Sequence, residues 1–242
     1  MDNKAKEKFM TDNPDLWNKF DDETKKYVCE NTCFWDKLDD DTKKYVLDNM
    51  EVVNYHAGQN IHSGDVQCVG VLFVKSGRLR VYIMSEDGKE VTLYRIGPGE
   101  VCILTASCVL SEITFDVYVD AEEMSQAVVL NAYAFSKLID SNIYIENFAN
   151  RMKAQRFSDV MWTMQQILFY SFDKRLAIFL YEELIKNGPI IRYSHMEIAK
   201  YLGSAREVVS RMLKYFENEG IVKVSRKEIE IIDKKKLMER IS

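Results

Sequence analysis

Residues 194–232 read SHMEIAKYLGSAREVVSRMLKYFENEGIVKVSRKEIEII, and this stretch decides the fold of the C-terminal part of the chain. It predicts two short helices that meet at a tight turn at Gly203. Each helix is expected to begin with a capping box, in which a serine and a glutamate three residues later satisfy backbone amides. The two pairs are Ser194 with Glu197 and Ser204 with Glu207. Two capped helices in tandem predict a helix-turn-helix unit.

The second of these helices has an apolar half and a polar half, at about 100° per residue. Its apolar half holds Val208, Val209, Met212, Leu213, Tyr215 and Phe216. Its polar half holds Arg206, Glu207, Ser210, Arg211 and Lys214. Arginine bonds guanine, glutamate accepts from cytosine and serine is adaptable, so this half suits the edges of DNA bases. The plainer alternative is a solvated face on a unit that contacts protein.

A β-hairpin follows the two helices and is expected to form a wing. Its strands are Ile221–Val224 and Ile229–Ile232, with a turn at Ser225–Lys227. Two capped helices, a divided helix surface and a wing in this order favour DNA binding over protein contact. The stretch therefore predicts the winged helix-turn-helix of a transcription regulator. The expected DNA-binding residues are Ser194, Ser204, Arg206, Glu207, Ser210, Arg211 and Lys214.

The composition fits a soluble globular protein with one large domain or two smaller ones. Of the 242 residues, 47% are hydrophobic and 29% are charged. No apolar run reaches membrane-spanning length, and the first residues lack the apolar core of a signal peptide. We therefore expect a cytoplasmic protein with no membrane partner, whose five cysteines are reduced thiols.

The charge is unevenly distributed along the chain. The net charge of the whole chain is −5. Residues 191–242 hold 12 Lys and Arg against 8 Asp and Glu, so their net charge is +4. The residues before them therefore carry a net charge of −9. A basic C-terminal module on an acidic body favours contact with phosphates at one end only.

The N-terminal region contains an internal duplication. Residues 16–31, LWNKFDDETKKYVCEN, and residues 34–49, FWDKLDDDTKKYVLDN, agree at ten of sixteen positions. Each copy predicts a short amphipathic helix begun by aspartate. Cys29 stands where the second copy has Leu47, so we expect Cys29 to be buried. We assign residues 1–32 to an N-terminal helical extension that packs on the following domain.

Residues 33–135 are expected to form a β-roll, a jelly-roll-like barrel of short strands. Runs of β-forming residues alternate with glycine turns over this segment. The predicted strands are Val71–Lys75, Arg78–Met84, Glu90–Ile96, Thr114–Val119 and Ala127–Asn131.

A long helix and a hinge are expected over residues 136–171. Its apolar residues recur at spacings of 3, 4, 3 and 4, the seam of a coiled coil. The seam residues are Ala154, Phe157, Met161, Met164 and Leu168. The alternative is a core helix within one subunit, but a helix this long beside a small roll leaves an apolar stripe to cover, so we favour a dimer interface. Asp173 is expected to cap the next helix, Lys174–Lys186, in a DNA-binding domain over 172–242.

This α+β order of roll, dimerisation helix and winged helix-turn-helix resembles the Crp/Fnr family of bacterial transcription regulators over about residues 33–242. The resemblance lies in Gly58, Gly64, FVKSGRLRVYI (73–83), EDGKEVTLYRIGPGE (86–100) and SAREVVSRMLKYFENEGIV (204–222). The family's recognition helix carries Glu, two variable residues, a small residue and Arg, here Glu207, Ser210 and Arg211. Arg206 before Glu207 matches the cAMP-receptor branch, and Ser210 before Arg211 matches the Fnr branch.

The resemblance implies a homodimer on double-stranded DNA. It implies that Arg211 contacts a guanine, Glu207 a cytosine on the opposite strand and Ser210 a thymine. The expected target is an inverted repeat of TTGA-like half-sites about one helical turn apart. RNA polymerase is a further candidate partner. The sequence has no phosphate loop, HExxH or Ser–His–Asp spacing, so we do not expect an enzyme.

Family members that bind cyclic nucleotides hold the phosphate with a Gly-Glu pair and a later Arg-Ser or Arg-Thr pair. The chain keeps Gly99–Glu100, but Phe115 and Asp116 stand at the later pair, and no arginine lies between Arg95 and Arg151. Like charges about 4 Å apart cost on the order of 4 kcal/mol at an effective dielectric of about 20. We therefore expect an effector other than cAMP.

Several alternatives remain for what the roll senses. One is an apolar small molecule in a pocket, and the candidate pocket residues are Glu100, Cys102, Ile103, Leu104, Cys108 and Phe115. A second is a thiol switch between Cys102 and Cys108. A third is an iron–sulfur cluster, although the relatives that bind one have three close N-terminal cysteines where this chain has two, Cys29 and Cys33. A fourth is a degenerate sensor on a constitutive DNA binder.

The three histidines do not suggest a metal or haem site. His56 and His62 flank a glycine turn and are expected at the surface, and His195 is expected in the first turn of the first DNA-domain helix. We predict no bound cofactor and no metal.

Overall fold

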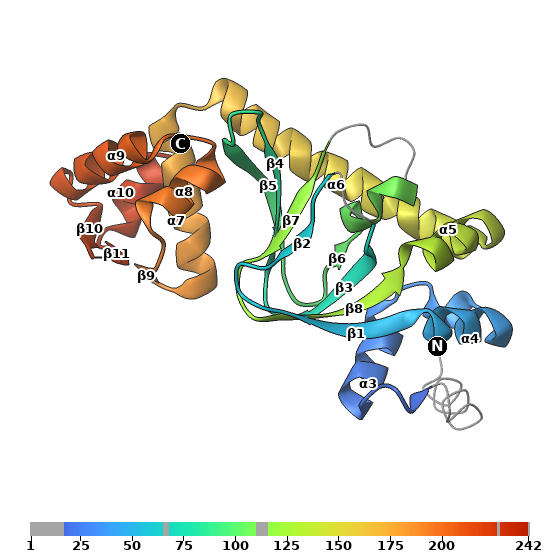
Figure 1. The fold of residues 1–242 in the computed structure, drawn as a ribbon. Coiled ribbons are helices and arrows are strands. Elements are labelled where there is room, and N and C mark those ends of the chain that lie inside the picture. Colours follow the sequence, from blue (N-terminus) through green and yellow to red (C-terminus); the bar gives the residue numbers. More distant parts are fainter. Residues whose placement is uncertain (1–16, 65–67, 110–115, 227, 242) are drawn as a thin grey trace. The chain divides into compact units, whose positions relative to one another are not determined.

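A computed structural model describes residues 17–64, 68–109, 116–226 and 228–241, without the side chains of 107–109. The chain divides into two compact units. One unit is Met1–Tyr82 with Tyr94–Ser158, and the other is Ile83–Leu93 with Asp159–Ser242. Figure 1 labels the helices and strands of both units. Among the described residues, no helix is both long enough and apolar enough to span a bilayer.

The duplicated segment forms two equivalent helices, α3 (Asp22–Asn31) and α4 (Asp40–Asp48), on either side of the 3₁₀ turn Trp35–Lys37. Asp21 and Asp39, one from each copy, accept a hydrogen bond from the backbone N–H three residues later, at 2.7 Å in both cases. The aspartate caps that the repeat predicts are therefore confirmed. Cys29 is buried, which confirms its expected apolar role.

The first copy packs on the roll. The Tyr27 hydroxyl donates to the carbonyl of Val74 at 2.6 Å, and burial raises the pKa of Tyr27 to about 12. The nearly buried Lys75 ammonium lies 3.1 Å from Glu23 and 3.7 Å from Asp21. These contacts join α3 to β3 (Gly70–Ser76), so the extension has the packing role that the sequence suggests.

The roll consists of two four-stranded sheets, with strand orders β1-β8-β3-β6 and β2-β7-β4-β5. Its strands are β1 (Met50–Tyr55), β2 (Asn60–His62), β3, β4 (Leu79–Met84), β5 (Glu90–Ile96), β6 (Val101–Cys102), β7 (Tyr118–Ala121) and β8 (Ser125–Asn131). Leu72, Phe73, Val81, Val119 and Leu130 are at most 1% exposed and belong to the core. The predicted β-roll is confirmed.

Four of the five predicted strands lie within two residues of the observed ones, and the fifth is displaced. The strand predicted at Thr114–Val119 runs over Tyr118–Ala121, while residues 114 and 115 lie outside the described part of the chain. Strands β1, β2 and β6 are absent from the prediction. Two of these are only three and two residues long, too short for a periodic signal.

Three helices follow the roll: α5 (Ala132–Ser141), α6 (Ile143–Phe169) and α7 (Phe172–Asn187). Helix α6 has 27 residues, about 40 Å at 1.5 Å per residue, and confirms the predicted long helix. The prediction that Asp173 caps α7 is wrong, because the extended residue Ser171 is the N-cap. Asp173 lies inside the first turn, where its negative charge still suits the helix dipole.

The C-terminal elements form a winged helix-turn-helix. They are β9 (Ile190–Ile191), α8 (His195–Leu202), α9 (Arg206–Asn218), β10 (Val222–Ser225), β11 (Glu228–Ile231) and α10 (Lys234–Glu239). Strands β10 and β11 pair antiparallel as the predicted wing, and β9, which the sequence did not indicate, extends the sheet from the other edge of β11. The core joins α7, α8, α9 and the wing through Leu176, Leu180, Ile198, Val209, Leu213, Phe216 and Ile229.

Candidate nucleic-acid interface and sensor site

The capping box at the start of α8 is confirmed. The Ser194 hydroxyl accepts from the Glu197 N–H at 3.2 Å, and the Glu197 carboxylate accepts from the Ser194 N–H at 2.6 Å. Gly203 ends α8 in the left-handed conformation at φ 58°. Both ends of the first helix of the unit are thus fixed by the residues that the sequence indicated.

The second capping box, Ser204 with Glu207, is wrong. The N-cap of α9 is Ala205, which has no side-chain cap, and α9 begins at Arg206. Ser204 instead donates its N–H to the Ala199 carbonyl at 2.9 Å and so helps to close α8. The turn at Gly203 therefore uses one more residue than the prediction allowed. As a result, Glu207 does not serve as the capping partner of Ser204 and remains exposed on α9.

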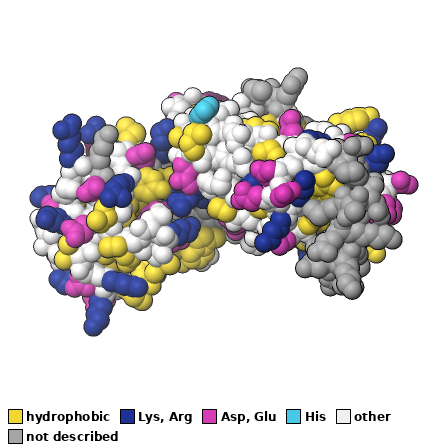
Figure 2. Space-filling view, turned by 90° about the horizontal axis from the view of Figure 1, so that it is seen from below, with side chains coloured by type: hydrophobic (Ala, Val, Ile, Leu, Met, Phe, Trp, Pro, Cys, Tyr) yellow, Lys and Arg dark blue, Asp and Glu magenta, His cyan; other side chains and the backbone are white. Residues whose placement is uncertain are grey.

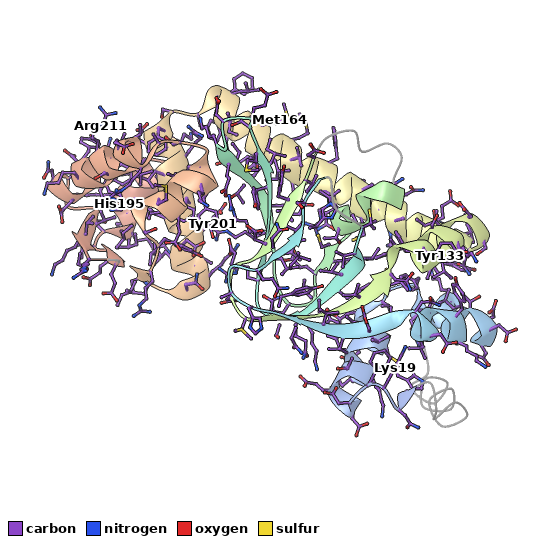
Figure 3. The ribbon with its side chains drawn as sticks, in the orientation of Figure 1. Lys19, Tyr133, Met164, His195, Tyr201 and Arg211 are labelled. Carbon is purple, nitrogen blue, oxygen red and sulfur yellow. The ribbon has the colours of Figure 1, made fainter. Side chains whose placement is uncertain are left out.

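Helix α9 has the polar and apolar halves that the sequence predicts. Val209, Leu213 and Phe216 are fully buried, and the five residues of the polar half are exposed. Figure 3 shows Arg211 projecting from α9, and Figure 2 shows many Lys and Arg side chains over the surface of this part. Tyr215 is a correction, since it is 41% exposed and lies under the Arg240 guanidinium at 5.4 Å.

The polar half of α9 is linked to the wing through Glu217. One carboxylate oxygen of Glu217 lies 2.8 Å from the Lys214 ammonium, and the other accepts from the Val224 N–H at 3.1 Å. These hydrogen bonds lower the pKa of Glu217, with the one from Lys214 the larger cause. The wing is therefore held against the recognition helix beside its exposed half.

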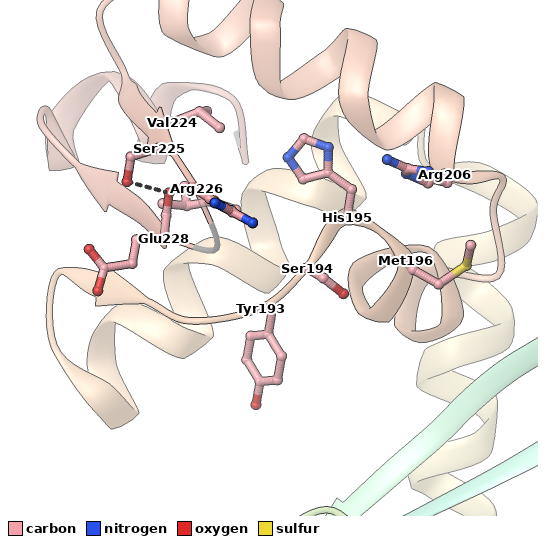
Figure 4. Close-up of a pocket in the computed structure, with 10 residues that line it drawn as sticks. Tyr193, Ser194, His195, Met196, Arg206, Val224, Ser225, Arg226 and Glu228 are labelled. Atoms are coloured by element: carbon pink, nitrogen blue, oxygen red, sulfur yellow. Dashed lines mark hydrogen bonds between the residues drawn. The ribbon is translucent and has the colours of Figure 1, made fainter.

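A pocket of about 350 Å³ lies where α8, α9 and the wing meet (Figure 4). It is lined by Tyr193, Ser194, His195, Met196, Arg206, Val224, Ser225, Arg226, Glu228 and Ile229. Burial and the positive charge of Arg206 lower the pKa of His195 from its ordinary 6.5. His195 has the predicted place in the first turn of α8. Arg226 lines this pocket but was not among the expected DNA-binding residues, and a basic residue in the turn of the wing is the sequence signal that could have added it to the candidates.

The five seam residues of α6 are all exposed in the single chain. Phe157 and Leu168 are 67% and 65% exposed, and Met161 and Met164 are both 44% exposed. Met164 is labelled on α6 in Figure 3. An apolar stripe of this size on one helix face is what a partner surface would cover.

Arg156, on the same helix, faces the roll and is only 4% exposed. Its guanidinium donates to the Val101 carbonyl at 3.3 Å and lies 4.8 Å from the centre of the Tyr94 ring. The burial of Arg156 is not evident from the sequence, because a charged residue between seam positions resembles an ordinary solvated one.

The expected effector-pocket residues fall into two environments. Cys102, Ile103 and Leu104 are buried in the roll, next to Thr105, whose hydroxyl donates to the Gly70 carbonyl at 2.6 Å. Glu100 is exposed, and its carboxylate accepts from the Gly97 N–H at 2.7 Å within its own turn. Phe115 and the Cys108 side chain lie outside the described residues.

The cysteines differ in state. Cys29, Cys33 and Cys102 form no disulfide bond, and only Cys33 of these three is exposed. Burial raises the pKa of Cys102, which disfavours the thiolate needed for a switch. Cys68 is disulfide-bonded, so the expectation that all five cysteines are reduced thiols is wrong. In the part of the chain that the structure describes, no group of three or more His, Cys, Asp or Glu could hold a metal ion.

His62 does not occupy the surface position that we expected. It is 3% exposed, and burial lowers its pKa. The residue follows Ile61 in β2, and both side chains of this short strand are buried. His56, before the turn, is exposed as predicted.

The chain combines a β-roll, a long helix and a winged helix-turn-helix. This combination defines a class of transcription regulators in which a sensor domain is joined to a DNA-binding domain. Two family models match accordingly. The cyclic nucleotide-binding domain matches residues 52–142, and the Crp-like helix-turn-helix domain matches residues 174–240. The chain belongs to the Crp/Fnr family.

Individual relatives agree with this assignment. A solved structure from Eubacterium rectale ATCC 33656, classed with the crp/fnr regulators, is 40% identical, covers 88% of this chain and 99% of its own, and superposes with a TM-score of 0.85. The cyclic AMP receptor protein of Thermus thermophilus is 26% identical over 65% of this chain and 73% of that relative. The lactate racemization regulatory protein of Lactiplantibacillus plantarum is 24% identical over 70% of this chain and 81% of that relative.

Proposed function

We propose that this chain is a homodimeric regulator that recognises an inverted repeat of TTGA-like half-sites through Glu207, Ser210 and Arg211 of α9. The observation that supports the proposal most is the placement of these three side chains. They are exposed on a helix whose opposite half, Val209, Leu213 and Phe216, is fully buried. The helix is thus held firmly while its polar half is free to enter a major groove.

The half-site is tested by selection from random duplexes with the purified protein. The expected result is enrichment of TTGA-like half-sites as an inverted repeat about one helical turn apart. Enrichment of an unrelated sequence would contradict the assignment of bases, and no enrichment would contradict sequence-specific binding.

The dimer is the second part of the proposal, and the seam on α6 supports it. Two such helices packed side by side would cover the exposed Phe157, Met161, Met164 and Leu168 and would set the spacing of the two recognition helices. A ligand that binds one arrangement of this helix pair better than another would then change the affinity for DNA.

The third part is that the effector is not cAMP. A relative is named for cAMP, and the roll of this chain matches the cyclic nucleotide-binding model. However, Glu100 is engaged with its own turn. Asp116, which stands in place of the Ser or Thr of the family's later pair, is acidic, exposed and close to Gly64. Calorimetry with cAMP and with cGMP is expected to give no heat of binding, and micromolar affinity for either would overturn this part.

A redox-regulated version of the same regulator is the alternative, and one observation favours it. Cys68, next to β3 of the roll, is disulfide-bonded. If this bond controls the protein, DNA affinity changes on reduction with dithiothreitol, and the Cys68→Ser variant behaves like the reduced protein. Equal affinity with and without reductant would leave the ligand-gated or constitutive regulator. Neither version of the proposal includes a catalytic activity. Both place the protein in the cytoplasm, where a bacterial DNA-binding regulator acts.

A further inference from the structure

The pocket between α8, α9 and the wing brings three basic side chains to one hollow in the DNA-binding unit. His195 comes from the first turn of α8, Arg206 from the first turn of α9 and Arg226 from the position directly after β10. In Figure 4 the Arg206 and Arg226 side chains extend toward His195 from the recognition helix and from the wing. Two guanidinium groups, with an imidazole between them that can gain a charge, suit an anion.

We propose that this pocket binds one phosphodiester of the DNA backbone and that His195 takes up a proton from solvent as the phosphate enters. The inference rests on the proposed DNA-binding function and adds a pH dependence to it. A neutral imidazole has one N–H donor, and its other ring nitrogen is an acceptor that repels a phosphate oxygen. Protonation turns that nitrogen into a second donor and gives the ring a positive charge, which strengthens its hydrogen bond to a phosphate.

The charges that face His195 determine the direction of the effect. Arg206 from α9 and Arg226 from the wing are positive, and Glu228 from β11 is the acidic residue among the pocket-lining side chains. Glu228 lies 3.1 Å from the Arg192 guanidinium, which offsets its charge. On α8 itself, the Glu197 carboxylate is engaged with the Ser194 N–H at 2.6 Å.

Without DNA, burial and Arg206 keep the pKa of His195 below 6.5, so the ring is neutral at pH 7. A bound phosphate is negative and raises this pKa. DNA affinity must then increase as the pH falls through the pKa of the complex, and it must level off below the pKa of the free protein. One proton taken up per subunit gives at most about a tenfold gain in the association constant of each subunit per pH unit.

The test compares DNA affinity between about pH 8 and about pH 6, the range in which histidine titrates. It uses the full chain and two duplexes, one with the TTGA inverted repeat and one with the same bases scrambled. Because a phosphate contact is independent of sequence, both duplexes should show the pH dependence. The variants are His195→Asn, which cannot take up the proton, and His195→Arg, which is always charged. His56→Asn is the matched control, since His56 is exposed on the roll.

The wild type and His56→Asn should gain affinity as the pH falls. His195→Asn should bind weakly and His195→Arg tightly, both with little change over the range. If His195→Asn proves unstable, two measurements still test proton uptake by His195. One is the pH profile of His195→Arg, and the other is calorimetry on the wild type in buffers of different ionisation enthalpy, which counts the protons taken up on binding. Equal pH profiles for the wild type and both His195 variants, or no proton uptake, would overturn the inference.

The same data separate this inference from the proposed function. If the two duplexes bind equally, the half-site assignment has failed, while the pH profile still reports on His195. If the repeat is preferred but the pH profile does not depend on His195, only the phosphate pocket has failed.

Discussion

At the scale of the residue, specific recognition is expected to depend on Arg211. Its side chain is exposed on the polar half of α9. A bidentate arginine–guanine contact is worth about 1–3 kcal/mol. We therefore expect Arg211→Ala to weaken binding to the selected repeat by that amount and to relax the preference at one base position per half-site, as measured by competition with single-base variants.

Lys235→Ala provides a control for charge in that experiment. Lys235 is exposed on α10, so its loss changes the net charge equally without touching α9. It should leave the base preference unchanged. An Arg211→Ala protein that keeps the wild-type preference at every position would show that α9 presents a different set of side chains to the bases.

Cysteine reactivity is a second property of single residues. Of the described cysteines that form no disulfide bond, Cys33 is exposed while Cys29 and Cys102 are buried. Burial raises the pKa of Cys102, so its thiolate is further disfavoured at neutral pH. We expect iodoacetamide to alkylate Cys33 first in the native protein and the other two only after denaturation, as read by peptide mass analysis. Rapid native labelling at Cys102 would show that the roll opens around it.

At the scale of the element, the roll depends on the close approach of β3 and β8. Gly70, at φ 125°, starts β3, and a Cβ there would lie 2.1 Å from the Leu130 carbonyl oxygen. Gly70→Ala therefore requires the paired strands to separate, and we expect a loss of about 3 kcal/mol or more in the free energy of unfolding, measured with urea. Gly58→Ala is the control, because φ is 79° but the space is open, and only about 1 kcal/mol is expected.

A Gly70→Ala loss no larger than that of Gly58→Ala would mean that the sheet adapts at this point. The comparison separates the strain of a left-handed residue, which both variants suffer, from the steric clash that only Gly70→Ala creates. The sequence indicated Gly58 as a turn but gave no sign of the tight approach at Gly70, because that depends on the partner strand.

Elements with a long repeating pattern were predictable, and those defined by contacts were not. Helix α6 and the two halves of α9 follow from a period near 3.6, which continues over many residues. The strands β2, β6 and β9 have two or three residues each and form because neighbouring strands are already in place. The cap of α9 was misplaced because the Gly203 turn takes Ser204 into the end of α8, which depends on turn geometry rather than on residue type.

At the scale of the whole molecule, the candidate sites also differ in how far the sequence predicts them, because some lie on one element and others depend on contacts between distant residues. The exposure of the candidate DNA-reading side chains on α9 could be predicted because they belong to one helix with a regular period. The phosphate pocket could not, since His195, Arg206 and Arg226 come from three elements that meet only in the folded unit. The burial of Arg156 could not be predicted either, because the groups that it contacts, the Val101 carbonyl and the Tyr94 ring, are distant from it in sequence.

Assembly is the last property of the whole molecule that the seam allows us to predict. Phe157→Glu places a carboxylate in an apolar stripe, and in a two-fold dimer it does so twice, close to the symmetry axis. We expect the dimer dissociation constant to increase at least about a hundredfold, which is about 2.8 kcal/mol.

Gln155→Glu adds the same charge on the exposed opposite side of α6 and should leave the dimer intact. Sedimentation measures both, and DNA binding follows, because one subunit alone can engage only one half-site. A Phe157→Glu protein that remains dimeric would place the subunit contact elsewhere, and a wild type that is monomeric even with the inverted repeat would remove the geometric basis for reading two half-sites at a fixed spacing.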